Sequence, residues 1–163
     1  MRVIGKVLFW LIVLLVVAFA GFAVWVRVAP VDAAAEHVDP LTVTRAANPN
    51  NVLLGPAGTD GADREAAVWM ATPEALMAAF DAAALAAERT ERIAGSVEDL
   101  HATYLQRSAL MAYPDMVSVK ALPAGEGATL AIYSRSRFGR SDLGVNDKRV
   151  SAWLDAIALP RVE

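Results

Sequence analysis

The densest group of polar residues lies at positions 133–149, YSRSRFGRSDLGVNDKR. Five basic residues stand there against Asp142 and Asp147, so the segment is locally cationic in an acidic chain. Gly139 and Gly144 permit tight backbone between an expected strand and a helix start. Backbone amides are free at a helix N-terminus and arginine grips oxyanions bidentately, so the pattern is typical of an anion site. The basic residues are Arg135, Arg137, Arg140, Lys148 and Arg149, and the candidate binding residues are Arg135, Ser136, Arg137, Ser141, Asp142, Asn146 and Arg149.

The same segment also has a purely structural interpretation, which the residue types favour. Asp142 can accept hydrogen bonds from loop amides or pair with an arginine, and so hold the strand-to-helix connection in place. A third interpretation is catalysis, in which a hydrolase uses Asp142 with His101 or Ser136. The sequence leaves all three interpretations open.

Motifs for metals, cofactors and common catalytic centres are absent from the sequence. His37 and His101 are its two histidines and lie far apart along the chain, so we predict no metal site. There is no cysteine, which excludes disulfides and thiol chemistry and suits a periplasmic protein. There is also no P-loop, no G-x-S-x-G and no H-E-x-x-H. We therefore expect no cofactor, and a binding module rather than an enzyme.

Positions 7–26, VLFWLIVLLVVAFAGFAVWV, form an apolar run without charge or proline. About 20 apolar residues is the length a helix needs to cross a hydrocarbon core of roughly 30 Å. A cleaved signal peptide has a shorter apolar region, of about 7–15 residues, followed closely by a small-residue cleavage site. The sequence therefore predicts an uncleaved anchor over residues 1–27, with the lipid bilayer as the partner of residues 7–26.

The flanking charges predict the orientation of this anchor. Arg2 and Lys6 precede the span, and only Arg27 follows it closely. Since positive charge is retained in the cytoplasm, we expect a single-pass protein of the bacterial inner membrane, with residues 28–163 in the periplasm. Removing these three from 15 basic and 18 acidic side chains leaves 12 and 18, a net charge of −6. That balance excludes a general nucleic-acid binder.

Beyond the span, the composition predicts a linker and then one small domain. Residues 28–65 are rich in Ala, Pro, Asn, Gly and Asp, which is typical of a flexible linker. Its one apolar trio, Val52-Leu53-Leu54, is hypothesised to dock on the domain as an arm. The soluble domain is expected at 66–160, where periodic apolar patterns begin.

The domain is expected to run strand, helix, four antiparallel strands, helix. We expect the first strand at 66–71 and a helix from Pro73 to about 88, capped by Thr72. The last helix carries an apolar stripe, is capped by Asn146 and ends at Pro160. The α+β domain is thus predicted to pack about five strands against two helices. The four further strands are expected at 91–95, 100–105, 116–122 and 129–137, and the stripe is Val150, Trp153, Leu154 and Ile157.

The polar segment resembles the C-terminal signature of the domain of unknown function 1499 family, which is found in bacteria and plants. That signature is a strand ending in S-x-S-R, then G-x-S-D-L-G-x-N and a basic pair. The family also tends to carry P-N-C-V near its start, and Pro49-Asn50-Asn51-Val52 fills that place here, with Asn51 in the position of the cysteine. The resemblance extends loosely back to about residue 48, and it implies a compact domain but no activity. The matching residues are Ser134, Ser136, Arg137, Gly139, Ser141, Asp142, Leu143, Gly144, Asn146 and Arg149.

The leading hypothesis is a membrane-tethered binding or interaction module that faces the periplasm. Its partner would be an envelope protein or an anionic ligand. The alternatives are a hydrolase acting on an envelope component and an accessory subunit that needs other membrane proteins. Geometry separates the first two: His101 and Asp142 across one pocket would favour an enzyme, whereas Asp142 engaged in backbone hydrogen bonds would not.

Overall fold

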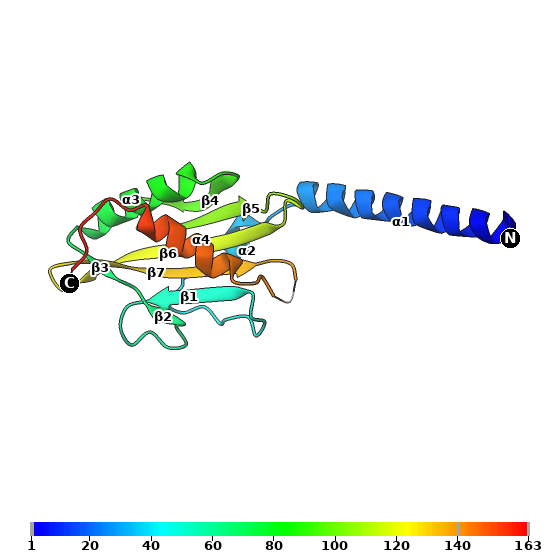
Figure 1. The fold of residues 1–163 in the computed structure, drawn as a ribbon. Coiled ribbons are helices and arrows are strands. Elements are labelled where there is room, and N and C mark those ends of the chain that lie inside the picture. The colour runs from blue at the N-terminus through cyan, green and yellow to red at the C-terminus, as the bar shows by residue number, and fades with distance from the viewer. Residues whose placement is uncertain (1, 140, 163) are drawn as a thin grey trace.

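A computed structural model describes residues 2–139 and 141–162. A long helix, α1 (Arg2–Val28), leaves one end of a folded domain (Figure 1). The domain combines a mixed sheet of seven strands with three further helices, which confirms the predicted α+β class with an N-terminal apolar helix. The sheet has more strands than the five expected, because two arise from the segment interpreted as a linker.

Helix α1 is long and apolar enough to cross a membrane over Val3–Val28, with a mean hydropathy of 3.0. The candidate span is longer than the expected run at 7–26 because the helix continues through both flanks. By length and composition alone, the same helix also fits a signal sequence. Near its C-terminal end, Arg27 donates from Nη1 to the Ala23 carbonyl at 2.9 Å, one turn back along the helix.

The strands lie in the order β2-β1-β7-β6-β5-β4, and β3 pairs with β7 outside this path. The contact of β1 with β2 is parallel, and the other pairings are antiparallel. The hairpin of β6 and β7 forms the centre of the sheet, in register from Asp115↔Ser136 to Ala124↔Gly127. The strands are β1 (Asn51–Gly55), β2 (Arg64–Glu65), β3 (Val68–Trp69), β4 (Thr90–Ser96), β5 (His101–Arg107), β6 (Pro114–Ala124) and β7 (Gly127–Ser136).

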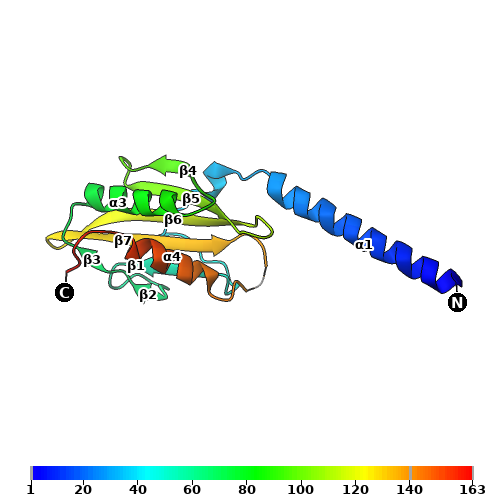
Figure 2. The ribbon, with the colours of Figure 1, turned by 45° about the horizontal axis from the view of Figure 1, so that its top comes forward.

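Helices α3 (Pro73–Ala86) and α4 (Val145–Asp155) cover one face of the sheet (Figures 1 and 2). Thr72 caps α3 by accepting from the Ala75 amide at 3.2 Å, as predicted. The predicted apolar stripe of α4 lies in the core, where Phe80 and Trp153 meet edge to face with centroids 5.8 Å apart. Successive strand residues point to opposite faces, so only alternate residues of each strand reach this core.

The opposite face of the sheet is covered by the chain between α1 and β1, including the short helix α2 (Ala33–Glu36). Glu36 binds Arg135 of β7 at 2.6 Å, and Asp39 binds Lys120 of β6 at 2.5 Å. Side chains of β5, β6 and β7 therefore hold this segment, part of the expected linker 28–65, against the sheet.

The apolar trio of the expected linker forms part of the sheet. Val52, Leu53 and Leu54 lie in β1 and are buried, and β1 pairs with β7 from Asn51↔Arg135 to Leu54↔Ile132. The hypothesis that the trio docks on the domain is confirmed, and the folded unit includes β1 ahead of residue 66.

Several boundaries differ from those expected, and α4 ends at Asp155 rather than at Pro160. The first strand, predicted at 66–71, shortens to β3 (Val68–Trp69), because the Met70 amide turns away to the Pro160 carbonyl at 2.9 Å. The cap of α4 is Gly144, with a left-handed φ of 77°, and not Asn146. Asn146 is the second helical residue and is buried, so its side chain points inward rather than back over the helix end.

Candidate functional site

The segment 137–144, which we call the signature loop, joins β7 to α4 at the end of the domain that lies against α1. Asp142 accepts hydrogen bonds from the Gly144 amide at 3.0 Å, the Asn146 amide at 2.8 Å and Asn146 Nδ2 at 2.7 Å. This carboxylate therefore occupies amides at the N-terminus of α4, where negative charge also complements the helix dipole. These hydrogen bonds agree with the structural interpretation of the sequence, in which Asp142 stabilises the connection between strand and helix.

The protonation of Asp142 follows from these contacts. Partial burial acts to raise the pKa of its carboxyl, but the hydrogen bonds donated by Asn146 and Gly144 outweigh burial and lower the pKa. A carboxyl with a lowered folded-state pKa contributes stability above its unfolded pKa and loses it as the pH falls through the folded pKa. Asp142 is thus ionised at neutral pH and stabilises the loop there.

We expect Asp142→Asn to destabilise the domain by about 1–2 kcal/mol, because a charge-assisted hydrogen bond weakens while the shape is kept. Asp142→Ala should cost more, since the amides of Gly144 and Asn146 lose their acceptor. Thermal unfolding of both variants beside wild type measures this, and the cost of Asp142→Asn should shrink below about pH 4. An unchanged melting temperature in both variants would contradict the structural role.

Asn146 connects the signature loop to the sheet from a fully buried position. Its Nδ2 donates to the Asn50 carbonyl at 3.0 Å and to Ser136 Oγ at 2.9 Å, besides Asp142. Its Oδ1 accepts from Ser134 Oγ at 2.5 Å and from Arg149 Nη1 at 2.8 Å. One amide on α4 thereby links the residue ahead of β1, strand β7 and the loop.

Asn50 of the P-N-N-V segment completes this network. Its side-chain amide donates to the carbonyls of Gly139 at 2.9 Å and Phe138 at 3.3 Å. Asn51, in the position of the family's cysteine, points to the other face and accepts from Arg45 Nη2 at 2.9 Å. The two sequence motifs thus meet in space through Asn50, which the sequence did not single out as a site residue.

A buried ion pair lies beneath the loop. Arg149 donates from Nη2 to Asp115 Oδ2 at 2.5 Å, and the two side chains are only 6% and 8% exposed. Arg149 also donates from Nε to Gln106 Oε1. Arg149 therefore neutralises a carboxylate of β6, and Asp115 is a functional candidate that sequence reasoning missed. The sequence offers one indication of this role, because Asp115 is an acidic residue at the start of the apolar strand β6.

A pocket of about 410 Å³ opens above this network. Its lining combines polar groups of Asp115, Ser136 and Asp142 with aromatic rings. Phe22 of α1 lies 6.4 Å from Tyr113 between ring centroids, so α1 contributes to the lining of the pocket. This is the candidate binding site. Its lining residues are Phe22, Ser108, Tyr113, Asp115, Ser136, Phe138, Gly139, Ser141, Asp142 and Val145.

The structure places the predicted site residues in four different surroundings. Ser136, Ser141 and Asp142 line the pocket, and Asn146 and Arg149 lie in the network below it. Arg137 points outward to the Pro30 carbonyl at 3.0 Å. Arg135 lies on the opposite face of the sheet, paired with Glu36, because it follows the inward-facing Ser134 by one residue. Arg140 lies outside the described residues.

The two histidines meet on that opposite face. The rings of His37 and His101 stack with centroids 4.0 Å apart, and His37 Nδ1 shares a hydrogen bond of 2.9 Å with Thr103 Oγ1. Burial and the neighbouring His101 lower the pKa of His37, against an opposing effect of Asp99. His101 Nε2 lies 3.1 Å from the Val38 carbonyl. The sheet thus separates His101 from Asp142, and no group of three potential metal ligands occurs among the described residues.

A larger hollow, of about 960 Å³, lies at the other end of the sheet around the β6–β7 turn. Its lining is mostly apolar and backbone, with Glu126 as its one titratable residue among those described. The described residues that line it form no buried hydrogen-bond network like that of Asn146, so the smaller pocket beside α1 is the better candidate for specific binding.

Comparison with known proteins gives one family. A family model described as "Protein of unknown function (DUF1499)" matches residues 34–157, from α2 to the end of the domain core. No curated protein matches the chain. No solved structure matches it either.

Proposed function

The chain belongs to the DUF1499 family of proteins of unknown function, and from this premise we propose that it is a membrane-anchored binding module whose pocket lies beside its membrane helix. The observation that carries this proposal is the composition of the pocket. Phe22 of α1, the signature loop and the start of β6 all line it. Removal of α1 as a cleaved signal peptide would take away one wall, which favours a retained anchor.

The ligand chemistry follows from the lining. Aromatic rings of Phe22, Tyr113 and Phe138 offer an apolar surface, while three serine hydroxyls and two carboxylates offer hydrogen-bond acceptors. The amides of the α4 N-terminus, which would hold an anion, are already bound by Asp142. The described lining therefore favours a ligand with an apolar body and a hydrogen-bond-donating polar group over the anion expected from the basic sequence.

The alternative function as a hydrolase has less support. It requires a base next to Asp142 or Ser136, and His101 faces the other side of the sheet. Ser136 Oγ accepts from Asn146 Nδ2, whose amide is a donor and cannot take up a proton from the hydroxyl. The described pocket residues include no histidine or lysine.

A variant that fills the pocket tests the binding proposal. Val145 lines the pocket at the start of α4, and Val145→Trp should exclude the ligand while keeping the fold, since the residue is 47% exposed. Leu85→Trp is the matched control, on an exposed position of α3 away from the pocket. Full-length protein extracted from its native membrane should carry a small molecule, detectable by mass spectrometry, in wild type and Leu85→Trp but not in Val145→Trp. Equal recovery from all three proteins would contradict the proposal.

We also propose that the domain faces the periplasm from the bacterial inner membrane. Arg2 and Lys6 lie at the N-terminal end of the apolar run at 7–26, and only Arg27 closely follows it. This excess of positive charge on the N-terminal side supports an N-terminus inside the cytoplasm. An export-dependent reporter fused after Glu163 should be active, whereas a reporter that works only in the cytoplasm should not. The reverse pattern would overturn the orientation.

A further inference from the structure

Two loops at the end of the domain next to α1 each expose a leucine. One loop, 108–113, joins β5 to β6, and the other, 137–144, joins β7 to α4. Leu110 is 81% exposed and Leu143 is 87% exposed, more than any other large hydrophobic residue described outside α1. Exposed apolar groups that cluster at one end of a domain mark a contact surface.

These loops lie level with the last turns of the membrane helix. Arg27 donates from Nη2 to the Leu110 carbonyl at 3.0 Å, and Trp25 lies 6.0 Å from Phe138 between ring centroids. Phe22 meets Tyr113 five residues before Arg27, which corresponds to about 7.5 Å along a helix. Figures 1 and 2 show both loops at the end of the domain where α1 leaves it. If α1 spans a bilayer, this end of the domain reaches the headgroup layer.

The backbone around Leu143 holds its side chain outward. Leu143 has a left-handed φ of 52°, a conformation that costs a leucine energy. Asp142 fixes the turn by accepting from the Gly144 amide, and Ser141 Oγ accepts from the Leu143 amide at 3.4 Å. Inside the protein this strain is not offset by burial of the leucine. An apolar environment outside the protein would offset it.

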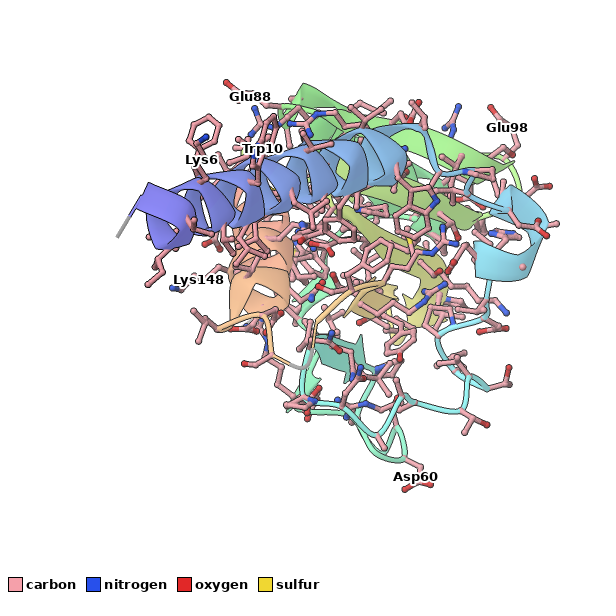
Figure 3. All side chains as sticks on the ribbon, turned by 90° about the vertical axis from the view of Figure 1, so that its right-hand side faces the viewer. Lys6, Trp10, Asp60, Glu88, Glu98 and Lys148 are labelled. Atoms are coloured by element: carbon pink, nitrogen blue, oxygen red, sulfur yellow. The ribbon has the colours of Figure 1, made fainter. Side chains whose placement is uncertain are left out.

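The charges at this end fit a lipid surface. Arg27 and Arg137 are exposed there, and so is Lys148 in the first turn of α4, which Figure 3 labels. Exposed cations beside apolar loop tips can contact phosphate groups while the leucines lie deeper.

We propose that loops 108–113 and 137–144 insert Leu110 and Leu143 into the bilayer leaflet that surrounds the C-terminal end of α1. This rests on the proposed function in one respect, that α1 crosses a bilayer. Residues of both loops line the pocket, Tyr113 from one and Phe138 from the other. The pocket therefore takes its ligand from the leaflet, and the ligand class is a membrane amphiphile.

Depth measurements on the full chain test the insertion. The sequence has no cysteine, so Leu110→Cys and Leu143→Cys each accept a single environment-sensitive fluorophore without background labelling. The labelled chains are placed in nanodiscs of phosphatidylethanolamine and phosphatidylglycerol that carry lipid-attached quenchers. Leu15→Cys within α1 is the control inside the bilayer, and Leu85→Cys and Val162→Cys are controls at exposed positions of the domain. For fluorophores at positions 110, 143 and 15 we expect a blue-shifted emission and quenching of most of the fluorescence. Fluorophores at positions 85 and 162 should show neither effect.

The outcomes separate this inference from the proposed function. Quenching at 15 with water-like spectra at 110 and 143 would overturn the insertion and leave the anchor in place. No quenching at 15 would overturn the anchor and, with it, the insertion. Quenching at only one loop would overturn the proposal for the other loop. Cysteines at 110 and 143 that give water-like spectra in nanodiscs but are protected from labelling in native membranes would overturn bilayer insertion in favour of a protein partner.

Discussion

Arg149→Met is expected to destabilise the domain by about 3–5 kcal/mol, because it leaves a buried carboxylate without its counter-charge. Asp115 is 8% exposed at its side chain, and Arg149 neutralises it at 2.5 Å. Methionine approximates the length of the arginine stem, so the packing of the aliphatic part is largely retained. The loss comes from the uncompensated charge and from the unmade hydrogen bonds to Gln106 and Asn146.

Matched variants separate this effect from a general sensitivity to arginine replacement. Arg64 pairs with Asp147 at 2.9 Å, but both side chains are well exposed, so Arg64→Met should cost less than about 1 kcal/mol. Adding Asp115→Asn to Arg149→Met removes the buried charge and should restore part of the stability. Denaturant unfolding of the full chain in detergent, followed by tryptophan fluorescence, measures all three. Equal losses from Arg149→Met and Arg64→Met would contradict the assigned ion pair.

Much of the fold was predictable because local patterns and tertiary packing agree. Thr72-Pro73 begins α3 as its capping chemistry predicts, and the stripe from Val150 to Ile157 meets the core. The alternation in β7 also places Ile132 on the core face and Arg135 on the other. In these elements apolar side chains are buried and charged side chains are exposed or paired, so the apolar periodicity of the sequence suffices to predict the element and its inward face.

The segment between α1 and β1 could not be interpreted in this way. Its contacts are long-range and polar: Glu36 reaches Arg135, and the Ala46 amide donates to the Tyr133 hydroxyl at 3.2 Å. A chain held by such contacts needs no periodic apolar face, so its composition resembles that of a linker. The stacking of His37 on His101 was not predicted for the same reason. The distance between two residues along the sequence does not show which strand the segment ahead of β1 packs against.

For the candidate site, the sequence predicted the segment but not its geometry. Basic residues at 135–149 suggested one anion site, yet Arg135 and Arg149 lie on opposite faces of the sheet and each already has a carboxylate partner. The role of Asp142 was predictable from local Asx-turn chemistry. The roles of Asp115 and Asn50 depend on strands brought together only by the fold.

Asn146→Asp is expected to be among the most damaging isosteric changes in the chain, at roughly 3–5 kcal/mol near neutral pH. The side-chain nitrogen of Asn146 donates to the Asn50 carbonyl, Ser136 Oγ and Asp142 Oδ2, all within 3.0 Å. An oxygen in its place cannot donate when ionised, and it would face the ionised Asp142 at a position where the present distance is 2.7 Å. Two carboxylates that share one site cannot both remain charged without cost.

The pH dependence distinguishes this explanation from a simple packing defect. Repulsion raises the folded-state pKa of the coupled pair of carboxyls above the unfolded value, so the folded variant binds an extra proton as the pH falls. The stability cost of Asn146→Asp relative to wild type should therefore be largest near pH 7.5 and should shrink toward pH 4.5, where a shared proton can again donate. Asn146→Ala is the control, because it removes the same donors without adding charge and its cost should change little over that range. Thermal unfolding of both variants at the two pH values measures the difference. A cost for Asn146→Asp that is equal at both pH values would mean that the amide nitrogen does not face Asp142, and the assigned hydrogen-bond network would be wrong.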